Sequence, residues 1–492
     1  MPRTLAVLLA IPLALSAVPV ARQETIDAAT LERITREAMD RSQVHRTFTH
    51  FVDTIGPRLT ASPAYKAAAD WSREQLTNWG MTSARLEAWE FGRGWQLEHF
   101  TLDMVEPRYM PLIAYPEGWS ASMSGEITAT PVYAGGVSGQ DLEAMRDTLK
   151  GAIVLAHPAQ TSFVREDRGQ PTDPGYVAPS TALTAGQTQG GRGRGQGRGG
   201  TPAQQVLREA GPAVVLRTSR GEHGTMFVLG RDQRANALPS VIVAGEHYNM
   251  LVRMVTAGLP VKVRVNLKTR YLEADRNGYN VVAEIPGQHA TLKDEVVMIG
   301  AHLDSWHSAP GATDNADGAA VVLEAMRILS AIGVKPHRTI RVALWGGEEQ
   351  GLLGSREYVR RHLAGDGNAA ARERFSVYFN IDPGAGPIYG WFLQGQANAR
   401  AIMDGWLAPL TKVGARKNVP DTIGNTDHLS FTDIGLPAFN PIQDYVDYDV
   451  RTHHTNVDTY ERVREADLKQ AAIVMATFAY HAAMRTERFP RP

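Results

Sequence analysis

Short apolar runs that end in metal-binding residue types constrain this chain more than any other feature. The first, residues 296–299, is rich in β-branched residues and predicts a buried strand. It leads to His302 and Asp304, which point to the same side in extended backbone. A loop rich in Gly, Pro and Ser then reaches Asp314, just before a predicted helix. Open α/β sheets bind ligands at this end of their strands. The simpler alternative is a solvated strand end, with Asp314 as a helix N-cap.

Later runs repeat this arrangement. The polar residues are Glu348 and Glu349 after residues 339–345, Asp382 after residues 377–381, and His453 and His454 late in the chain. Adjacent carboxylates repel each other unless a cation or a proton separates their roles. Imidazole and carboxylate groups together suit Zn²⁺ and similar divalent ions. A carboxylate that bridged two ions would complete a two-metal site.

The order of the predicted elements favours an α/β fold with a mixed, mostly parallel sheet flanked by helices. Strands are expected at residues 279–285, 295–301, 339–345 and 376–381, and helices at about 316–332, 350–363, 397–413 and 465–485. Before them, residues 25–53 have helical periodicity. Ser62 and Pro63 then predict the start of another helix that closes at Gly80.

The middle of the chain has a different character. Residues 121–265 contain short β runs separated by Gly and Pro turns, which predicts a β-rich domain inserted between residues 22–120 and 266–492. Residues 186–200 are a low-complexity Gly/Arg stretch. Its composition resembles nucleic-acid-binding segments, but a flexible loop is the simpler interpretation.

The first 21 residues have the features of a signal peptide. Arg3 precedes an apolar run, and cleavage is expected after Ala17 or Ala21. The apolar run is too short for a comfortable transmembrane helix, so we expect export without stable membrane insertion; an uncleaved anchor is the alternative. The chain has no cysteine, so disulfides are excluded, and we expect a periplasmic or secreted protein.

The overall charge excludes a partner class. The chain has 51 Lys and Arg against 52 Asp and Glu, a formal net charge of -1. No global basic field exists to attract nucleic acid, so function must come from a local site.

Six motifs in order resemble the M28 family of zinc exopeptidases, and most closely its carboxypeptidase Q-like branch. They are HLDS at 302–305, TDNADG at 313–318, GGEEQGLLGS at 346–355, NIDPG at 380–384, TDHLSF at 426–431 and HHTNVDT at 453–459. The resemblance implies a zinc-exopeptidase fold with a protease-associated (PA) domain inserted before the metal motifs. A homodimer is what this branch suggests.

The resemblance also implies two Zn²⁺ per chain. Asp314 would bridge the two ions, His302 and Asp382 would complete the first, and Glu349 and His454 the second. Spacing alone leaves His453 and His454 as alternatives, and the family pattern His-Thr-x-x-Asp-Thr selects His454.

Two further residues receive catalytic roles from the resemblance. Glu348 would be the general base, and Asp304 would hold the far nitrogen of His302, as metal-bound histidines usually require. Asp427 and His428 match a motif beside the cleft but receive no role, and Trp306 and His307 match no ligand position.

The expected function is that of an exported dizinc exopeptidase, an aminopeptidase, carboxypeptidase or dipeptidase, which cleaves terminal bonds of short peptides. A glutaminyl cyclase-like enzyme with a single zinc is the first alternative. A non-catalytic binding protein on the same scaffold is the second, but such proteins lose ligands or the base, and both remain here.

Overall fold

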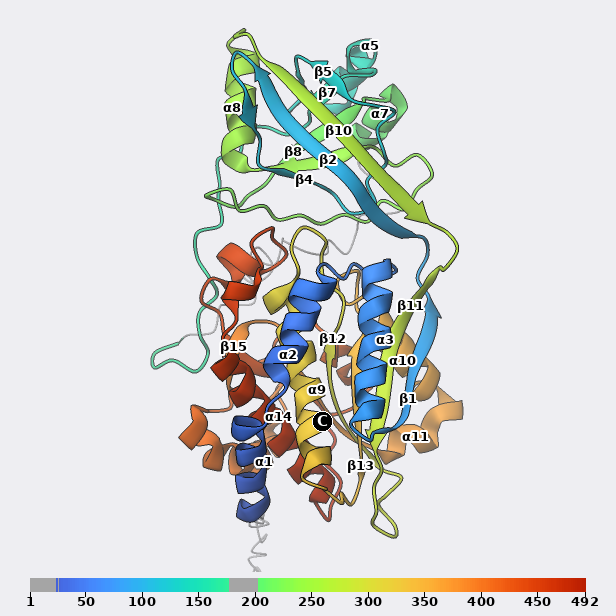
Figure 1. Ribbon diagram of the computed structural model, residues 1–492, viewed down its shortest axis with the longest axis vertical. Coiled ribbons are helices and arrows are strands. Elements are labelled where there is room, and N and C mark those ends of the chain that lie inside the picture. The colour runs from blue at the N-terminus through green and yellow to red at the C-terminus, as the bar shows by residue number, and fades with distance from the viewer. Residues whose placement is uncertain (1–23, 25, 177–201) are drawn as a thin grey trace, which may run out of the picture.

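The computed structural model describes residue 24 and residues 26–176 and 202–492. They form two lobes joined by long strands (Figure 1). The predicted signal peptide, residues 1–21, and the Gly/Arg stretch, residues 186–200, lie outside the described residues.

A seven-stranded mixed sheet forms the centre of the larger lobe. Its strands lie in the order β1 (Thr82–Glu90), β11 (Asn277–Ile285), β13 (Thr339–Trp345), β12 (Val296–His302), β14 (Phe375–Asn380), β16 (Ala438–Asp444) and β15 (Ala385–Phe392). The four strands β13, β12, β14 and β16 are parallel, and antiparallel strands lie at both edges. This confirms the predicted mixed sheet. The sequence patterns predict neither β15 nor β16, because Gly and Pro interrupt β15 and Pro441 interrupts β16.

Helices cover both faces of this sheet. One face carries α1 (Ala28–Asp40), α2 (Val44–Thr49), α3 (Pro63–Asn78), α9 (Asp317–Ala331), α12 (Arg400–Leu407) and α14 (Glu465–Met484), and the other carries α10 (Leu353–His362), α11 (Ala369–Arg374) and α13 (His428–Thr432). Strand periodicity explains the two cores: in β12, Val297 and Ile299 face the first core and Met298 faces the second.

The N-terminal helices follow the prediction with one difference. Ser62 caps α3, and its hydroxyl accepts from the Tyr65 amide at 3.2 Å. The single helix predicted at residues 25–53 is broken after α1, because the Ser42 hydroxyl and the Gln43 amide donate to the Glu324 carboxylate of α9 at 2.9 and 3.1 Å. This tertiary contact turns the chain between α1 and α2.

The second lobe, here called the insert lobe, packs two sheets against each other. One has the order β3 (Met110–Pro111), β2 (Gly94–Glu106), β10 (Lys262–Leu272) and β5 (Ile127–Ala129), and the other the order β4 (Ala114–Pro116), β9 (Ser240–Val243), β8 (Val214–Thr218), β7 (Ile153–Leu155) and β6 (Val132–Tyr133). The helices of its described residues are α4 (Gly139–Ala144), α5 (Arg146–Leu149), α7 (Pro202–Ala210) and α8 (Gly245–Thr256). Because β2 pairs along its length with β10, the lobe runs from about residue 94 to residue 272. The predicted boundary at residues 120 and 121 therefore lies within the lobe.

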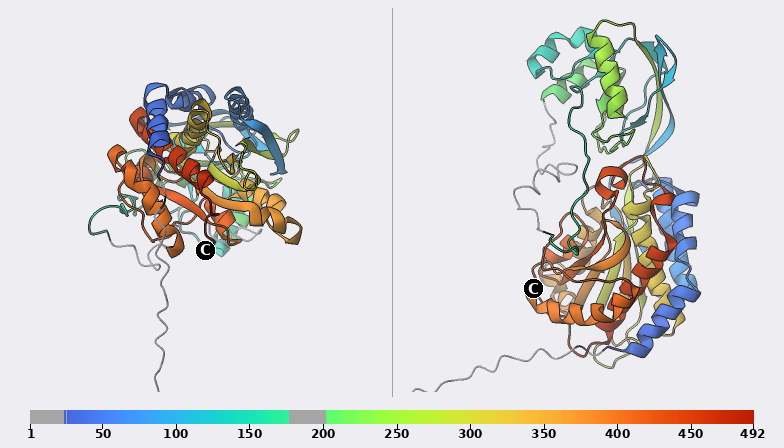
Figure 2. Two further views of the ribbon diagram at one scale, coloured as in Figure 1. Left: turned by 90° about the horizontal axis from the view of Figure 1, so that it is seen from below. Right: turned by 90° about the vertical axis from the view of Figure 1, so that its left-hand side faces the viewer.

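The insert lobe lies beyond the carboxyl ends of the parallel strands. The right-hand view of Figure 2 shows this from another side, with β2 and β10 leading from the edge of the main lobe into the insert lobe. Within the described part of the chain, every helix is too short or too polar to cross a membrane.

Candidate metal centre

The predicted metal residues come together at one edge of the sheet. His302 is the last residue of β12, Glu348 and Glu349 follow β13, and Asp382 follows β14. All four side chains are buried. Parallel strands bring their carboxyl ends to the same edge, so topology alone gathers residues that are far apart in the sequence.

Asp314 lies at the centre of this group. Its Oδ1 is 3.2 Å from His302 Nε2, and its Oδ2 is 3.3 Å from His454 Nε2. His302 Nε2 is also 3.7 Å from Asp382 Oδ2, and His454 Nε2 is 2.9 Å from Glu349 Oε2. Each oxygen of Asp314 therefore faces a different histidine, and each histidine has a second carboxylate of its own.

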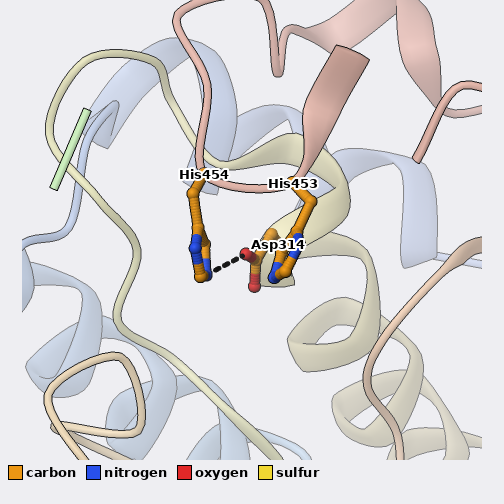
Figure 3. Close-up of side chains that lie close together, drawn as sticks. All are labelled: Asp314, His453 and His454. Atoms are coloured by element: carbon orange, nitrogen blue, oxygen red, sulfur yellow. Dashed lines mark ion pairs between the residues drawn. The ribbon is translucent and has the colours of Figure 1, made fainter. Parts of the chain in front are cut away.

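The His453 ring lies against the His454 ring, with ring centroids 3.8 Å apart. Figure 3 shows both rings reaching from one loop toward the Asp314 carboxylate. Donor atoms of Asp314, His453 and His454 lie within 4.8 Å of one another. The His453 ring also stacks on Tyr448, with ring centroids 5.0 Å apart. Asp314 and Glu349 both lie close to His454 Nε2, which favours His454 as the ligand, while His453 stays within reach of the same ion.

Hydrogen bonding fixes the tautomer of His302. Its Nδ1 lies 2.9 Å from the backbone carbonyl oxygen of Asp304. A carbonyl oxygen accepts but does not donate, so Nδ1 carries the proton. In the neutral imidazole, Nε2 is then the unprotonated nitrogen, and it faces Asp314 and Asp382, as metal binding requires.

The Asp304 side chain does a different job from the one expected. Its carboxylate is 3.6 Å from His302 Nδ1, too far for a hydrogen bond. It accepts instead from the Thr60 hydroxyl at 2.9 Å and from the amides of Glu348 and Glu349 at 3.2 and 3.3 Å. The backbone of Asp304 thus orients His302, and its carboxylate holds the Glu348–Glu349 turn.

The charges of this group favour a bound cation. Burial raises the pKa of the Glu349 carboxyl well above its ordinary value, and the nearby charge of Asp314 raises it further. Among the described residues, His302 Nε2, Asp314 Oδ2 and Glu349 Oε1 are buried without a hydrogen-bond partner. A ring nitrogen and carboxylate oxygens that lie close together without hydrogen-bond partners are typical ligands of a divalent ion such as Zn²⁺.

Two buried residues support the centre although no role was predicted for them. Asp458 accepts from the amides of Thr313 and Asp314 at 2.8 and 3.1 Å, and burial raises its pKa to about 7. Asp458 lies in the HHTNVDT motif, so the sequence could have indicated that it belongs to the site. Arg58 donates to the carbonyl oxygens of Leu303, Pro310 and Gly311 at 2.8, 2.6 and 3.0 Å. Nothing in the sequence around Arg58 distinguishes it from a surface arginine.

The other residues near the motifs stay outside the proposed ligand set. Asp427 is buried and accepts from the Ser355 hydroxyl at 2.5 Å, and burial raises its pKa to about 7. His428 Nε2 lies 3.1 Å from the carbonyl oxygen of Ile423. Trp306 lines the cavity at the metal centre, and His307 Nε2 donates to the carbonyl oxygen of Pro116 in the insert lobe at 2.8 Å.

Comparison with known proteins agrees with this geometry. Residues 280–479 match peptidase family M28. This part of the chain is an M28 peptidase domain. The M28 domain contains every predicted ligand, and the chain is a peptidase, a hydrolase of peptide bonds.

Similarity extends beyond the M28 domain. Carboxypeptidase Q from Bos taurus is 25% identical over 442 residues, which cover 89% of this chain and 85% of that protein. The crystal structure of a peptidase M28 precursor from Shewanella amazonensis superposes with a TM-score of 0.71 at 26% identity, covering 94% of this chain and 98% of that one. A zinc aminopeptidase from Bacillus subtilis has the same fold, with a TM-score of 0.61 at 19% identity and coverage of 91% and 96%. The insert lobe therefore belongs to an arrangement shared with these proteins.

Proposed function

We propose that this protein is an exported dizinc exopeptidase that hydrolyses terminal bonds of short peptides. One observation carries the proposal: the two oxygens of Asp314 face His302 and His454 separately. A carboxylate in that position can bridge two ions, which are typically about 3.5–4 Å apart in two-metal hydrolases. The name of the similar Bacillus subtilis structure supports zinc as the metal.

Each residue of the centre has a chemical task in this proposal. His302 and Asp382 hold one ion, Glu349 and His454 hold the other, and Asp314 holds both. When bound, two Zn²⁺ lower the pKa of a shared water and polarise the peptide carbonyl. Glu348 takes a proton from the attacking water and passes it to the leaving amine.

The position of the insert lobe is a second argument for short peptides as substrates. It lies across the carboxyl ends of the parallel strands (Figure 1) and contacts the loops that carry the ligands. A chain end reaches such a site more easily than the middle of a folded protein does. The names of the similar proteins include both a carboxypeptidase and an aminopeptidase, so they leave open which end is recognised.

Metal stoichiometry tests the centre directly. The metal-free protein is titrated with Zn²⁺ and analysed by elemental mass spectrometry, and two ions per chain are expected. A single ion in the wild type contradicts the dizinc proposal and favours the glutaminyl cyclase-like alternative. His454→Ala is expected to lose one ion, and His453→Ala is expected to keep both.

A peptide panel tests the reaction. Free dipeptides and N-blocked and C-blocked peptides are incubated with the zinc-loaded protein, and products are identified by mass spectrometry. Cleavage of C-blocked but not N-blocked peptides identifies an aminopeptidase, and the reverse pattern a carboxypeptidase. Cleavage of free dipeptides alone identifies a dipeptidase. Internal cleavage of blocked peptides contradicts an exopeptidase.

Export rests on the sequence of residues 1–21 and belongs to the same proposal. Expression of the full chain in a Gram-negative host should yield a periplasmic protein whose N-terminus begins after Ala17 or Ala21. A full-length protein retained in the cytoplasm contradicts export. We also expect a homodimer and a PA-type identity for the insert lobe, and light scattering in solution tests the first of these.

A further inference from the structure

The loop that carries His454 depends on the insert lobe for its conformation. We call residues 447–456 the His454 loop. His454 has a φ of 63°, in the left-handed region that residues with a side chain seldom adopt. The loop is not a strand of the central sheet. Its own turns and its contacts outside the sheet therefore hold it.

One part of the insert lobe pairs with this loop through the backbone. We call residues 222–228 the clamp segment. The Val228 amide donates to the His454 carbonyl oxygen at 3.0 Å, and the Asn456 amide donates to the Met226 carbonyl oxygen at 3.1 Å. The Asn456 side-chain oxygen also accepts from the Met226 amide at 2.6 Å. Phe227 and Thr455 thus form a short antiparallel bridge across the lobe boundary.

A second part of the insert lobe holds the start of the loop. We call residues 163–173 the arm, which runs from the insert lobe down beside the main lobe (Figure 2). Arg168 binds Asp449 with both ends of its guanidinium, at 2.8 and 2.5 Å, and its own amide donates to the same carboxylate at 2.9 Å. The Asp167 carboxylate accepts from the amides of Asp447 and Val450 at 2.8 and 3.0 Å.

The two halves of the metal centre are therefore supported differently. His302 belongs to a central strand, and Asp382 lies two residues after the end of another, next to the buried Ile381, so the core of the main lobe fixes both. His454 depends on the clamp segment and the arm. The loop of its partner Glu349 also meets the insert lobe, because Arg231 donates to the Gln350 carbonyl oxygen at 2.5 Å.

We propose that the insert lobe is a structural part of the metal centre, and that its arm and clamp segment set the affinity of the ion held by His454 and Glu349. Arg168 and Asn456 are positioning residues in this arrangement. The proposal rests on the two-ion function above. It implies that the ion on the His302 side does not depend on these contacts.

Zinc affinity of contact variants tests the proposal. Arg168→Met and Asn456→Ala are made in the full chain, with Arg146→Met as the control. Arg146 also binds a carboxylate with both ends of its guanidinium, that of Glu143, and its side chain is 38% exposed against 34% for Arg168. That pair lies wholly within the insert lobe. Zn²⁺ is titrated into the metal-free proteins in competition with a chromogenic chelator.

Both contact variants are expected to bind the second Zn²⁺ about tenfold or more weakly, because charge-assisted and bridging hydrogen bonds are lost. The first Zn²⁺ should bind as in the wild type, and Arg146→Met should match the wild type at both sites. Asp449→Asn should weaken the second site alone, and combining it with Arg168→Met should add little, because both remove the same contact.

A second measurement does not depend on zinc. Hydrogen–deuterium exchange of the metal-free proteins should be faster in the His454 loop of both contact variants and unchanged in β12. Unchanged exchange, or unchanged affinity for the second Zn²⁺ in a folded variant, overturns the proposal. If the wild type binds a single Zn²⁺, the dizinc function is wrong, and the role of the insert lobe is then judged on that one ion. If Arg168→Met leaves the affinity of that ion unchanged, the role proposed for the insert lobe is wrong as well.

Discussion

At the scale of single residues, the roles of the two acidic neighbours Glu348 and Glu349 depend on the direction of their side chains. Glu349 Oε2 lies 2.9 Å from His454, whereas Glu348 groups with His302 and Asp382. Both amides are held by the Asp304 carboxylate, so the turn presents two carboxylates to one centre at fixed positions. Such an arrangement allows one to bind metal and the other to move protons.

Glu348→Gln should therefore separate metal binding from turnover. We expect a fall in kcat of about 10²- to 10⁴-fold, because the amide cannot take a proton from water. Zinc content should stay at the wild-type level, as measured by elemental mass spectrometry beside steady-state kinetics. Glu357→Gln, at an exposed ion pair on α10, is the matched control and should keep full activity. Wild-type turnover in zinc-loaded Glu348→Gln would show that Glu348 is not the general base.

At the scale of elements, the loop between β12 and α9 is held from outside by Arg58. This side chain is fully buried, and burial lowers its pKa to about 10, so it stays charged at neutral pH. It contacts backbone carbonyls at both ends of the loop and reaches Gly311 just before η2 (Ala312–Ala316), which contains Asp314. The buried Arg58 guanidinium thus fixes, through the backbone, the position of Asp314, which we propose as the bridge between the two ions.

Arg58→Met should destabilise the main lobe by about 3 kcal/mol, because several buried carbonyl oxygens lose their donors. The measurement is urea unfolding followed by tryptophan fluorescence in the metal-free protein. Arg36→Met, at an exposed ion pair of α1, is the control and should cost less than about 0.5 kcal/mol. Equal unfolding midpoints for the two variants would show that Arg58 does not support the loop.

Asp27, the N-cap residue of α1, makes the stability of the protein depend on pH. Its carboxylate accepts from the Thr30 amide, and the Tyr480 hydroxyl of α14 donates to it at 2.7 Å. These hydrogen bonds, that from the Thr30 amide first, lower the pKa of Asp27. A lowered folded-state pKa means that the stabilisation is complete above the unfolded pKa of about 4. It is lost as pH falls through the lower folded value.

Asp27→Asn should remove this dependence. We expect the variant to be less stable than the wild type at pH 6, by up to about 1 kcal/mol, because the charged cap is lost. The difference should shrink below about pH 4, where the Asp27 carboxyl of the unfolded wild type takes up a proton, and further as the folded form does so at lower pH. Thermal unfolding at several pH values measures it. A stability difference that stays constant down to pH 3 would contradict the assignment.

At the scale of the whole molecule, the metal centre joins two lobes and distant parts of the chain. The proposed ligands lie at or after the ends of β12, β13 and β14 and in the His454 loop, which contacts the insert lobe. Buried carboxylates that lack a cation oppose folding. Metal binding and the stability of the whole chain are therefore linked.

Removal of metal by a chelator should abolish hydrolysis and lower the thermal unfolding midpoint, and added Zn²⁺ should restore both. An ion at 100 times its Kd adds about 2.7 kcal/mol to the stability of the folded state. Differential scanning calorimetry with and without chelator measures the shift, and His454→Ala should show a smaller one. Hydrolysis by pure protein that persists in chelator would argue against metal catalysis.

The sequence by itself determined the α/β class, the strands that end in metal-binding residues, and the family resemblance. These follow from local patterns, namely apolar periodicity and short motifs, which need no distant contact. The tertiary structure decided what depends on distant partners. It placed the boundary of the insert lobe at β2, gave the Asp304 carboxylate to the Glu348–Glu349 turn, and buried Arg58 beneath the loop that leads to Asp314. Hydrogen bonds between residues 44 to 245 positions apart leave no periodic pattern in the sequence, so only the folded structure shows them.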